Sequence, residues 1–187
     1  TLLSYLPFVV HFCLAIAIHE FAHALVASHR GDSTAKDRGR LTLNPFAHLD
    51  PMGTLFLLFA GVGWGRPVPI NPSRLPNPKQ DQLWISLAGP LSNILLATVW
   101  GILLWSLAAV DLSVWLGESA PLVVSWALGT GILLNIALAL FNLLPIFPLD
   151  GEKVVVGLLP DRWERRVVQF RNYGVIVLIL FLVGGPA

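Results

Sequence analysis

The sequence is poor in charge and in cysteine. Only 12% of its 187 residues are charged, against about 25% in ordinary soluble domains, and its mean hydropathy is +0.71. A single cysteine, Cys13, excludes a disulfide framework and a four-cysteine metal cage. The net charge is +1 and no basic run occurs, so nucleic acid is not an expected partner. These properties predict an integral membrane protein whose immediate partner is the lipid bilayer.

Long apolar runs predict an all-α polytopic fold, because a membrane helix needs about 20 such residues. The runs cover about 2–28, 83–110, 122–144 and, in a shorter stretch, 173–183. We therefore expect about four transmembrane helices in one membrane-embedded domain over residues 1–187. Its core would be about 1–151, followed by a basic connector and the last span in 152–187.

The first run has a second interpretation, as a signal peptide. Ala22-His23-Ala24 resembles a small-residue cleavage site. The run is too long for a signal peptide, however, and it carries ionisable residues and no basic lead, which favours a membrane span.

Two shorter segments do not fit a full crossing. Residues 52–62 are apolar but only about half a crossing in length, which predicts a re-entrant segment. Residues 63–78 carry five prolines, which forbid a helix and suit an extended strand at a sheet edge.

Basic residues predict which side of the membrane the loops occupy. Lysine and arginine lie at 30–40, 66–79 and 153–171, whereas the start of the chain and the 111–120 linker have none. Such residues accumulate on the cytoplasmic side. Four spans with both ends outside satisfy the pattern, provided that 52–62 does not cross.

The first span contains the motif His19-Glu20-Phe21-Ala22-His23. Histidines four residues apart lie on one face of a helix, so both imidazoles can reach one metal ion. Glu20 lies about 100° further round, where its carboxylate can act as the base for a reacting water. Ionisable groups within an apolar span are costly and usually mark function. The alternative is a buried polar cluster that fixes helix packing.

A catalytic zinc site usually has three protein ligands, and Asp150 is the candidate for the third. Pro145 and Pro148 end the preceding helix, and Gly151 permits a tight turn. The alternative is an ordinary loop aspartate that caps a helix. One crossing, 83–110, separates the two inward-running spans, which brings Asp150 to the side of His19 and His23 only if 52–62 does not cross.

At this point the chain resembles the site-2 proteases, in their compact bacterial form without PDZ or CBS domains. The resemblance is carried by His19-Glu20-Phe21-Ala22-His23, Ser86-Leu87-Ala88-Gly89-Pro90-Leu91-Ser92-Asn93, Gly65-Arg66-Pro67-Val68-Pro69-Ile70-Asn71-Pro72 and Asn142…Pro145…Asp150-Gly151. It implies an intramembrane zinc metalloendopeptidase that cleaves transmembrane helices of single-span membrane proteins. The compact pattern suggests a bacterial cell membrane, and the basic loops predict an active site toward the cytoplasm.

The expected site combines the residue chemistry with this resemblance. His19, His23 and Asp150 would bind one zinc ion per chain, and Glu20 would act as general base. The resemblance suggests that Asn142 contacts the substrate or the developing oxyanion; an interhelical hydrogen bond is the alternative. Residues 66–71 would either bind an extended substrate by β-augmentation or simply link two membrane elements.

Two other function classes use the same residues. A metal transporter could use His19, His23 and Asp150 as its transport site, but the internal repeats expected of a transporter are not visible. A catalytically silent scaffold that binds membrane helices would not need a base at Glu20.

Overall fold

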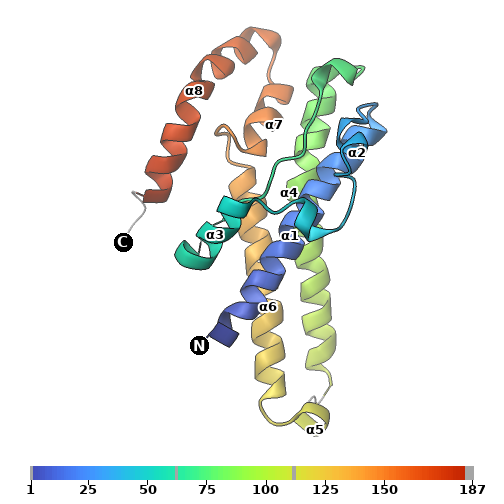
Figure 1. Ribbon diagram of the computed structural model, residues 1–187, viewed down its shortest axis with the longest axis vertical. Helices are drawn as coiled ribbons and strands as arrows, with labels where there is room; N and C mark the ends of the chain where they lie inside the picture. The colour runs from blue at the N-terminus through green and yellow to red at the C-terminus, as the bar shows by residue number, and fades with distance from the viewer. Residues whose placement is uncertain (1, 62, 111–112, 184–187) are drawn as a thin grey trace.

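The computed structural model describes residues 2–61, 63–110 and 113–183, and these residues form helices joined by irregular segments (Figure 1). No strand forms among them. The part predicted to be extended has one isolated antiparallel bridge, between Leu49 and Gly65. The all-α class predicted from the apolar runs is therefore confirmed.

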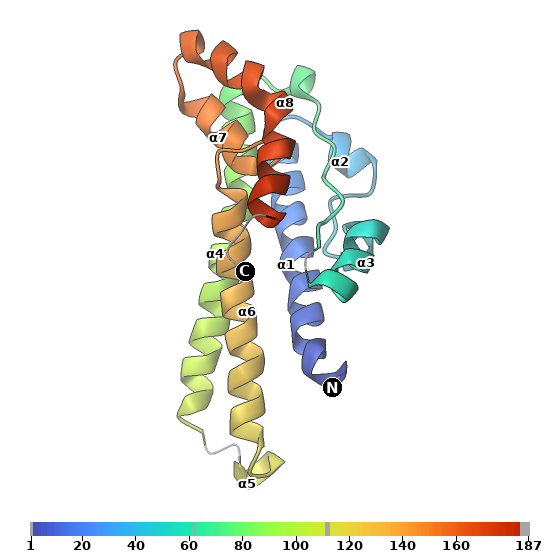
Figure 2. The same cartoon turned by 90° about the vertical axis from the view of Figure 1, so that its left-hand side faces the viewer.

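Three long helices form the centre of the molecule: α1 (Leu2–His29), α4 (Pro78–Ala108) and α6 (Ala120–Asn142). Helix α4 packs against both α1 and α6. In Figure 2 the colour shows that α1 and α6 run in one direction and α4 in the other. All three are long and apolar enough to cross a membrane, which fits the first three predicted spans.

The described residues contain three helices of this kind, where the sequence predicts about four. The fourth predicted span, 173–183, is the C-terminal part of α8 (Asp161–Val183). The first half of this helix is charged and its second half is apolar, so the helix as a whole is too polar to count as a membrane span. Its apolar end measures only about 16 Å at 1.5 Å per residue, about half of a bilayer core.

The predicted connector is also divided differently. Helix α7 (Asp150–Leu158) starts at Asp150 and ends before Pro160, and α8 begins at the next residue, Asp161. Proline at this position cannot continue the helical hydrogen bonding. The remaining short elements are α2 (Thr34–Asp37), η1 (Pro45–Ala47), η2 (Pro72–Arg74) and α5 (Ser113–Leu116).

The predicted half-crossing is helix α3 (Pro51–Ala60), which has 10 residues; Val62, at the predicted end, lies outside the described residues. The Asp50 carboxylate caps it by accepting from the Gly53 N–H at 2.8 Å. Leu57 on α3 is buried against Phe12 and Ile16 of α1. The helix thus packs on the bundle beside α1, and at about 15 Å it is too short to cross.

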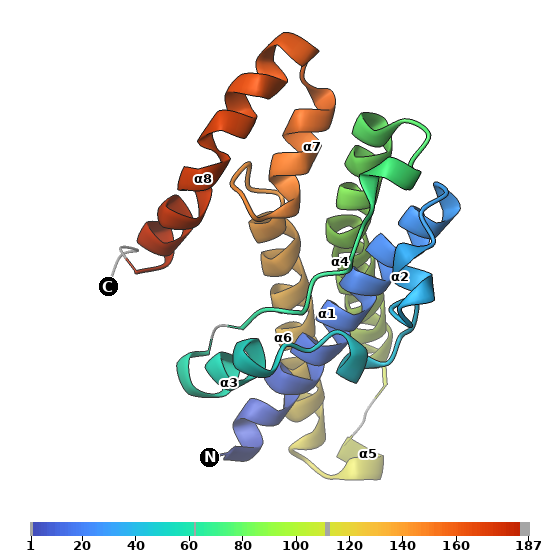
Figure 3. The same cartoon turned by 45° about the horizontal axis from the view of Figure 1, so that its top comes forward.

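Residues 65–71 form the extended segment that follows, and Figure 3 shows it running along α1 toward the start of α4. The Arg66 N–H donates to the His48 carbonyl at 2.7 Å. Arg40 donates from its guanidinium to the carbonyl of Arg66 at 2.5 Å. The segment is therefore held by hydrogen bonds from neighbouring loops, without a sheet.

Asp32, fully buried just after α1, fixes the far end of the extended segment. It accepts hydrogen bonds from the Asn71 N–H at 2.6 Å and from the N–H and hydroxyl of Thr34 at 3.0 and 2.5 Å. Burial by itself would raise the pKa of this carboxyl, but the hydrogen bonds from Thr34 and Asn71 outweigh it and hold the pKa below its ordinary value. The ionised form of Asp32 is the one that the fold stabilises.

Candidate functional site

The structure brings His19 and His23 of α1 together with Asp150, the first residue of α7. The Nε2 atom of each imidazole lies 3.1 Å from the same Asp150 oxygen, Oδ2. The two rings are 4.6 Å apart between centroids and almost perpendicular, at 82°. All three residues are buried. The pairing of two distant segments that the topology predicts is therefore present.

Gly89 lets the backbone of α4 pack directly against the imidazole rings of His19 and His23. A Cβ atom at this position would lie 2.6 Å from both Cε1 and Nε2 of His19 and would also meet Nε2 of His23. No side chain fits in that space, so glycine is required for α4 to form one wall of the cluster.

Asn93 determines which nitrogen of His19 carries the proton. His19 Nδ1 lies 2.6 Å from Asn93 Oδ1. The Asn93 amide nitrogen donates to Asn135 Oδ1 at 2.9 Å and to the Ala15 carbonyl at 3.3 Å, which fixes the orientation of the amide. His19 must therefore donate from Nδ1, and its Nε2 lone pair is left facing Asp150.

His23 has the same arrangement with a different partner. Its Nδ1 donates to the carbonyl of Ile85 on α4 at 2.6 Å, so its Nε2 is also an acceptor. When both imidazoles are neutral, two nitrogen lone pairs and a carboxylate oxygen therefore converge. Three acceptors at this spacing repel one another unless a cation lies among them.

This donor set fits a divalent metal ion. Two imidazole nitrogens and one carboxylate oxygen are common ligands of catalytic zinc, which keeps a fourth position open. Ligands about 2.0–2.1 Å from one tetrahedral ion lie about 3.3 Å apart, and the 3.1 Å separations here are close to that. The hydrogen bonds at both Nδ1 atoms orient the rings as in known zinc sites.

Glu20 lies beside the cluster and is held by the extended segment. Its Oε2 accepts the backbone N–H of Val68 at 2.9 Å, and the side chain is half-buried. The hydrogen bond orients one carboxylate oxygen and leaves lone pairs on the other. A carboxylate in this position can accept a proton from a water at the cluster.

Asn142, predicted to contact the substrate, is the last residue of α6. Its amide donates to the Leu138 carbonyl one turn earlier, at 2.9 Å. That hydrogen bond lies within one helix and is not the interhelical bond of the alternative interpretation. The role of Asn142 in catalysis stays a prediction.

Some supporting residues were not identified from the motifs. Asn93 was named only within the segment that carries the family resemblance, with no role in the chemistry, and Asn135 was not singled out. Both side chains are completely buried. A polar side chain within an apolar span is a recognisable signal, because it needs a partner inside the membrane. What no local pattern reveals is that the partner of Asn93 is a ring nitrogen of His19.

Comparison with known proteins points to a family of metalloproteases. The profile of "Peptidase family M50" matches residues 107–184. The candidate zinc metalloprotease YwhC of Bacillus subtilis is 41% identical over 182 residues, which cover 97% of this chain and 82% of YwhC. A second relative, the candidate zinc metalloprotease Rip2 of Mycobacterium tuberculosis, is 31% identical over 178 residues.

The chain spans much of each relative but not all of it. The Rip2 match covers 90% of this chain and only 64% of Rip2. Rip2 of Mycolicibacterium smegmatis gives similar figures, with 28% identity, 91% of this chain and 64% of the relative. No solved structure matches the chain at a significant level. On the extent of its match to YwhC and to the family profile, the chain belongs to peptidase family M50, the site-2 protease family, whose members are metalloproteases.

Proposed function

We propose that this protein is a zinc-dependent intramembrane endopeptidase that cleaves transmembrane helices of single-span membrane proteins. His19, His23 and Asp150 are the zinc ligands. The observation that carries the proposal is the convergence of two buried imidazole nitrogens on one buried Asp150 oxygen, each at 3.1 Å, with both histidines on a helix apolar enough to lie in a membrane. Such an arrangement can hold a divalent metal ion, and the family membership makes a peptidase the function to test.

The chain's own residues perform the remaining chemistry. When bound, zinc supplies a Lewis acid that activates water and polarises the scissile carbonyl. Glu20 accepts the proton from the attacking water and later delivers it to the leaving amine. The Val68 N–H holds Glu20 in place through Oε2, so that Oε1 is free to carry the proton. Asn142, at the end of α6, is the residue that would contact the substrate or the developing oxyanion once its amide leaves the Leu138 carbonyl.

The depth of the site supports cleavage within the membrane. His23 and His19 lie six and ten residues before the end of α1 at His29, which is about 9 and 15 Å along a helix. A bilayer core is about 30 Å thick, so the cluster lies in the half of the membrane nearest the end of α1. The basic loops at 30–40, 66–79 and 153–171 favour the cytoplasm for that side, in a bacterial cell membrane.

A helical substrate has no accessible peptide bond and must be unwound before cleavage. The extended segment, residues 65–71, offers an edge for the unwound chain. Its Arg66 and Val68 N–H groups already donate to His48 and Glu20, and Pro67 and Pro69 have no N–H to offer. Arg40 already donates to the carbonyls of Arg66 and Pro67, so the substrate would donate its own N–H groups to those of Val68 and Pro69.

Cleavage of model single-span substrates in liposomes tests the proposal. We expect wild-type protein with zinc to cleave them, and expect neither Glu20→Gln nor chelator-treated protein to do so. Glu20→Gln should still bind one zinc ion per chain, whereas Asp150→Ala should bind zinc much more weakly. Cleavage that survives Glu20→Gln would remove the mechanism, and zinc flux without proteolysis would indicate a transporter.

A further inference from the structure

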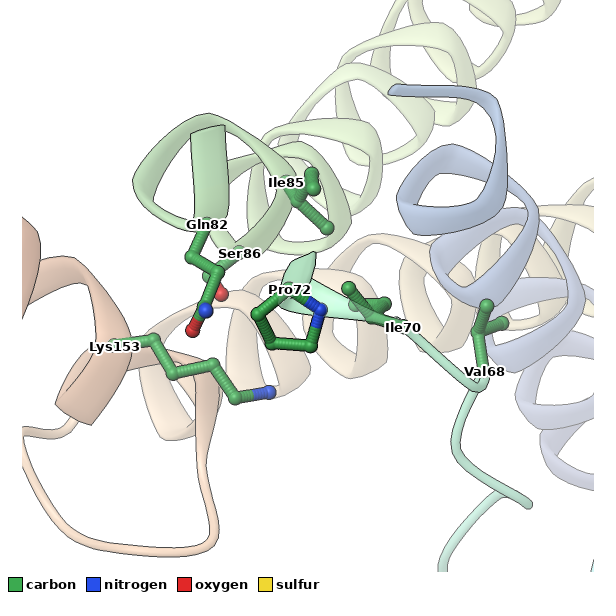
Figure 4. A pocket seen from close by; sticks show the side chains of 7 residues that line it. All are labelled: Val68, Ile70, Pro72, Gln82, Ile85, Ser86 and Lys153. Carbon is green, nitrogen blue, oxygen red and sulfur yellow. The ribbon is translucent and has the colours of Figure 1, made fainter. Parts of the chain in front are cut away.

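A cavity of about 250 Å³ lies next to the metal ligands, between the extended segment, the first turns of α4 and the start of α7 (Figure 4). Its apolar walls are Val68 and Ile70 of the extended segment, with Pro72 and Ile85. Ile85 is also the residue whose carbonyl accepts the Nδ1–H of His23. The cavity therefore adjoins the site where the peptide bond is to be cut.

The polar groups of the cavity come from Gln82 and Ser86 on α4 and from Lys153 on α7. Figure 4 shows the Lys153 side chain extending from α7 toward Pro72 and Gln82. Ser86 is 1% exposed, and its hydroxyl has no hydrogen-bond partner. Within the described part of the chain, no carboxylate forms an ion pair with Lys153. A buried hydroxyl without a partner is unfavourable, and the half-buried Lys153 has no carboxylate partner, so a ligand with acceptor oxygens could bind both groups.

We propose that this cavity is a substrate subsite for an acidic side chain, glutamate in the first place. The inference rests on the proposed function. The apolar walls contact the methylene groups of the glutamate, and the Lys153 ammonium pairs with its carboxylate. The Ser86 hydroxyl and the Gln82 amide can each donate a further hydrogen bond to that carboxylate.

The geometry of α4 gives the position of this glutamate in the substrate. Gly89 lies against both histidines, and Ser86 and Gln82 precede it by three and seven residues, or about 4.5 and 10.5 Å along the helix. An extended peptide advances about 3.3 Å per residue. The subsite therefore takes a side chain one to three residues from the scissile bond, on the flank that faces the end of α1.

The test compares substrates that differ at one residue. Each of the three positions on that flank is set in turn to Glu, Gln or Lys, in single-span substrates with blocked ends, so that no terminal carboxylate can occupy the cavity. At one position we expect the wild-type protein to cleave the Glu substrate about three- to tenfold faster than the Gln substrate, with the Lys substrate slowest. Lys153→Glu should reverse this order, and Lys153→Met should abolish it. Lys36→Met, which removes an exposed lysine on α2, should leave the preference unchanged.

A binding measurement separates this inference from the proposed function. The Glu20→Gln protein with zinc is titrated with the same blocked peptides carrying a fluorophore, and Glu peptides should bind more tightly than Lys peptides by a similar factor. If wild-type protein cleaves nothing, the proposed function fails, and these affinities still decide the subsite. Equal affinities for Glu and Lys peptides, or a Glu preference that persists in Lys153→Glu, would overturn the subsite.

Discussion

Replacing Gly89 by alanine should weaken zinc binding without unfolding the protein. The added Cβ would lie 2.6 Å from His19 Nε2. Ordinary contacts begin near 3.4 Å, so α4 and the imidazole must separate by about 0.8 Å. A displacement of about 1 Å in a site of this kind costs on the order of 100-fold in function. We expect a loss of zinc affinity of similar size in Gly89→Ala.

The assay is chelator competition on purified protein in detergent, with helical content followed by circular dichroism. Gly101 provides a matched control, because it lies on the same helix and a Cβ there meets nothing within 4 Å. Gly101→Ala should bind zinc as the wild type does. Both variants should be fully helical, since alanine is the better helix former.

Two results would refute this reasoning. Wild-type zinc affinity in Gly89→Ala would mean that the histidines do not depend on the close approach of α4. An equal loss of zinc affinity in Gly101→Ala would mean that the loss arises from a general change in α4 and not from contact with the imidazoles.

Three further predictions concern residues that support the cluster or hold the extended segment. Asn93→Leu removes the acceptor of the His19 Nδ1–H and should lower zinc affinity about 10- to 100-fold in the same competition assay; an unchanged affinity would contradict the assigned tautomer. Glu20→Gln should retain zinc while cleavage falls by about 10²-fold or more, as measured on the model substrates. Asp32→Asn should lower unfolding stability at pH 7 by about 1–3 kcal/mol, because a buried charge-assisted acceptor is lost. Since the pKa of Asp32 is depressed by the fold, its contribution is present above the unfolded value of about 3.9 and is lost as the pH falls through the folded pKa. In thermal unfolding, the stability difference between the wild type and Asp32→Asn should therefore narrow below about pH 4. A stability difference that does not change with pH would argue against the role of the carboxylate.

The part of the site that depends on local geometry was predictable. His19 and His23 share a helix face because the spacing of four residues fixes their direction, whatever the rest of the fold does. Asp150 could be added because its side of the membrane follows from the number of crossings. That argument required residues 52–62 not to cross, and α3, with 10 residues, does not.

What depends on packing between distant helices was not predictable in the same way. The hydrogen bond from His19 to Asn93 exists only because Gly89 lets α4 approach α1 at this depth. The boundary between connector and last span was also missed. The connector residues of α8 are rich in arginine, a good helix former, so α8 runs through the change from charged to apolar composition.

The hydrogen bond from the Val68 N–H to Glu20 connects the extended segment to the expected general base on α1. In the extended segment, the Val68 N–H donates to the Glu20 carboxylate, and the prolines on either side of Val68 have no N–H. The two residues next to Val68, Pro67 and Pro69, therefore offer Glu20 no substitute N–H. Any rearrangement that moves Val68 alters the surroundings of Glu20 at the same time, so the position of the backbone and the orientation of the carboxylate change together.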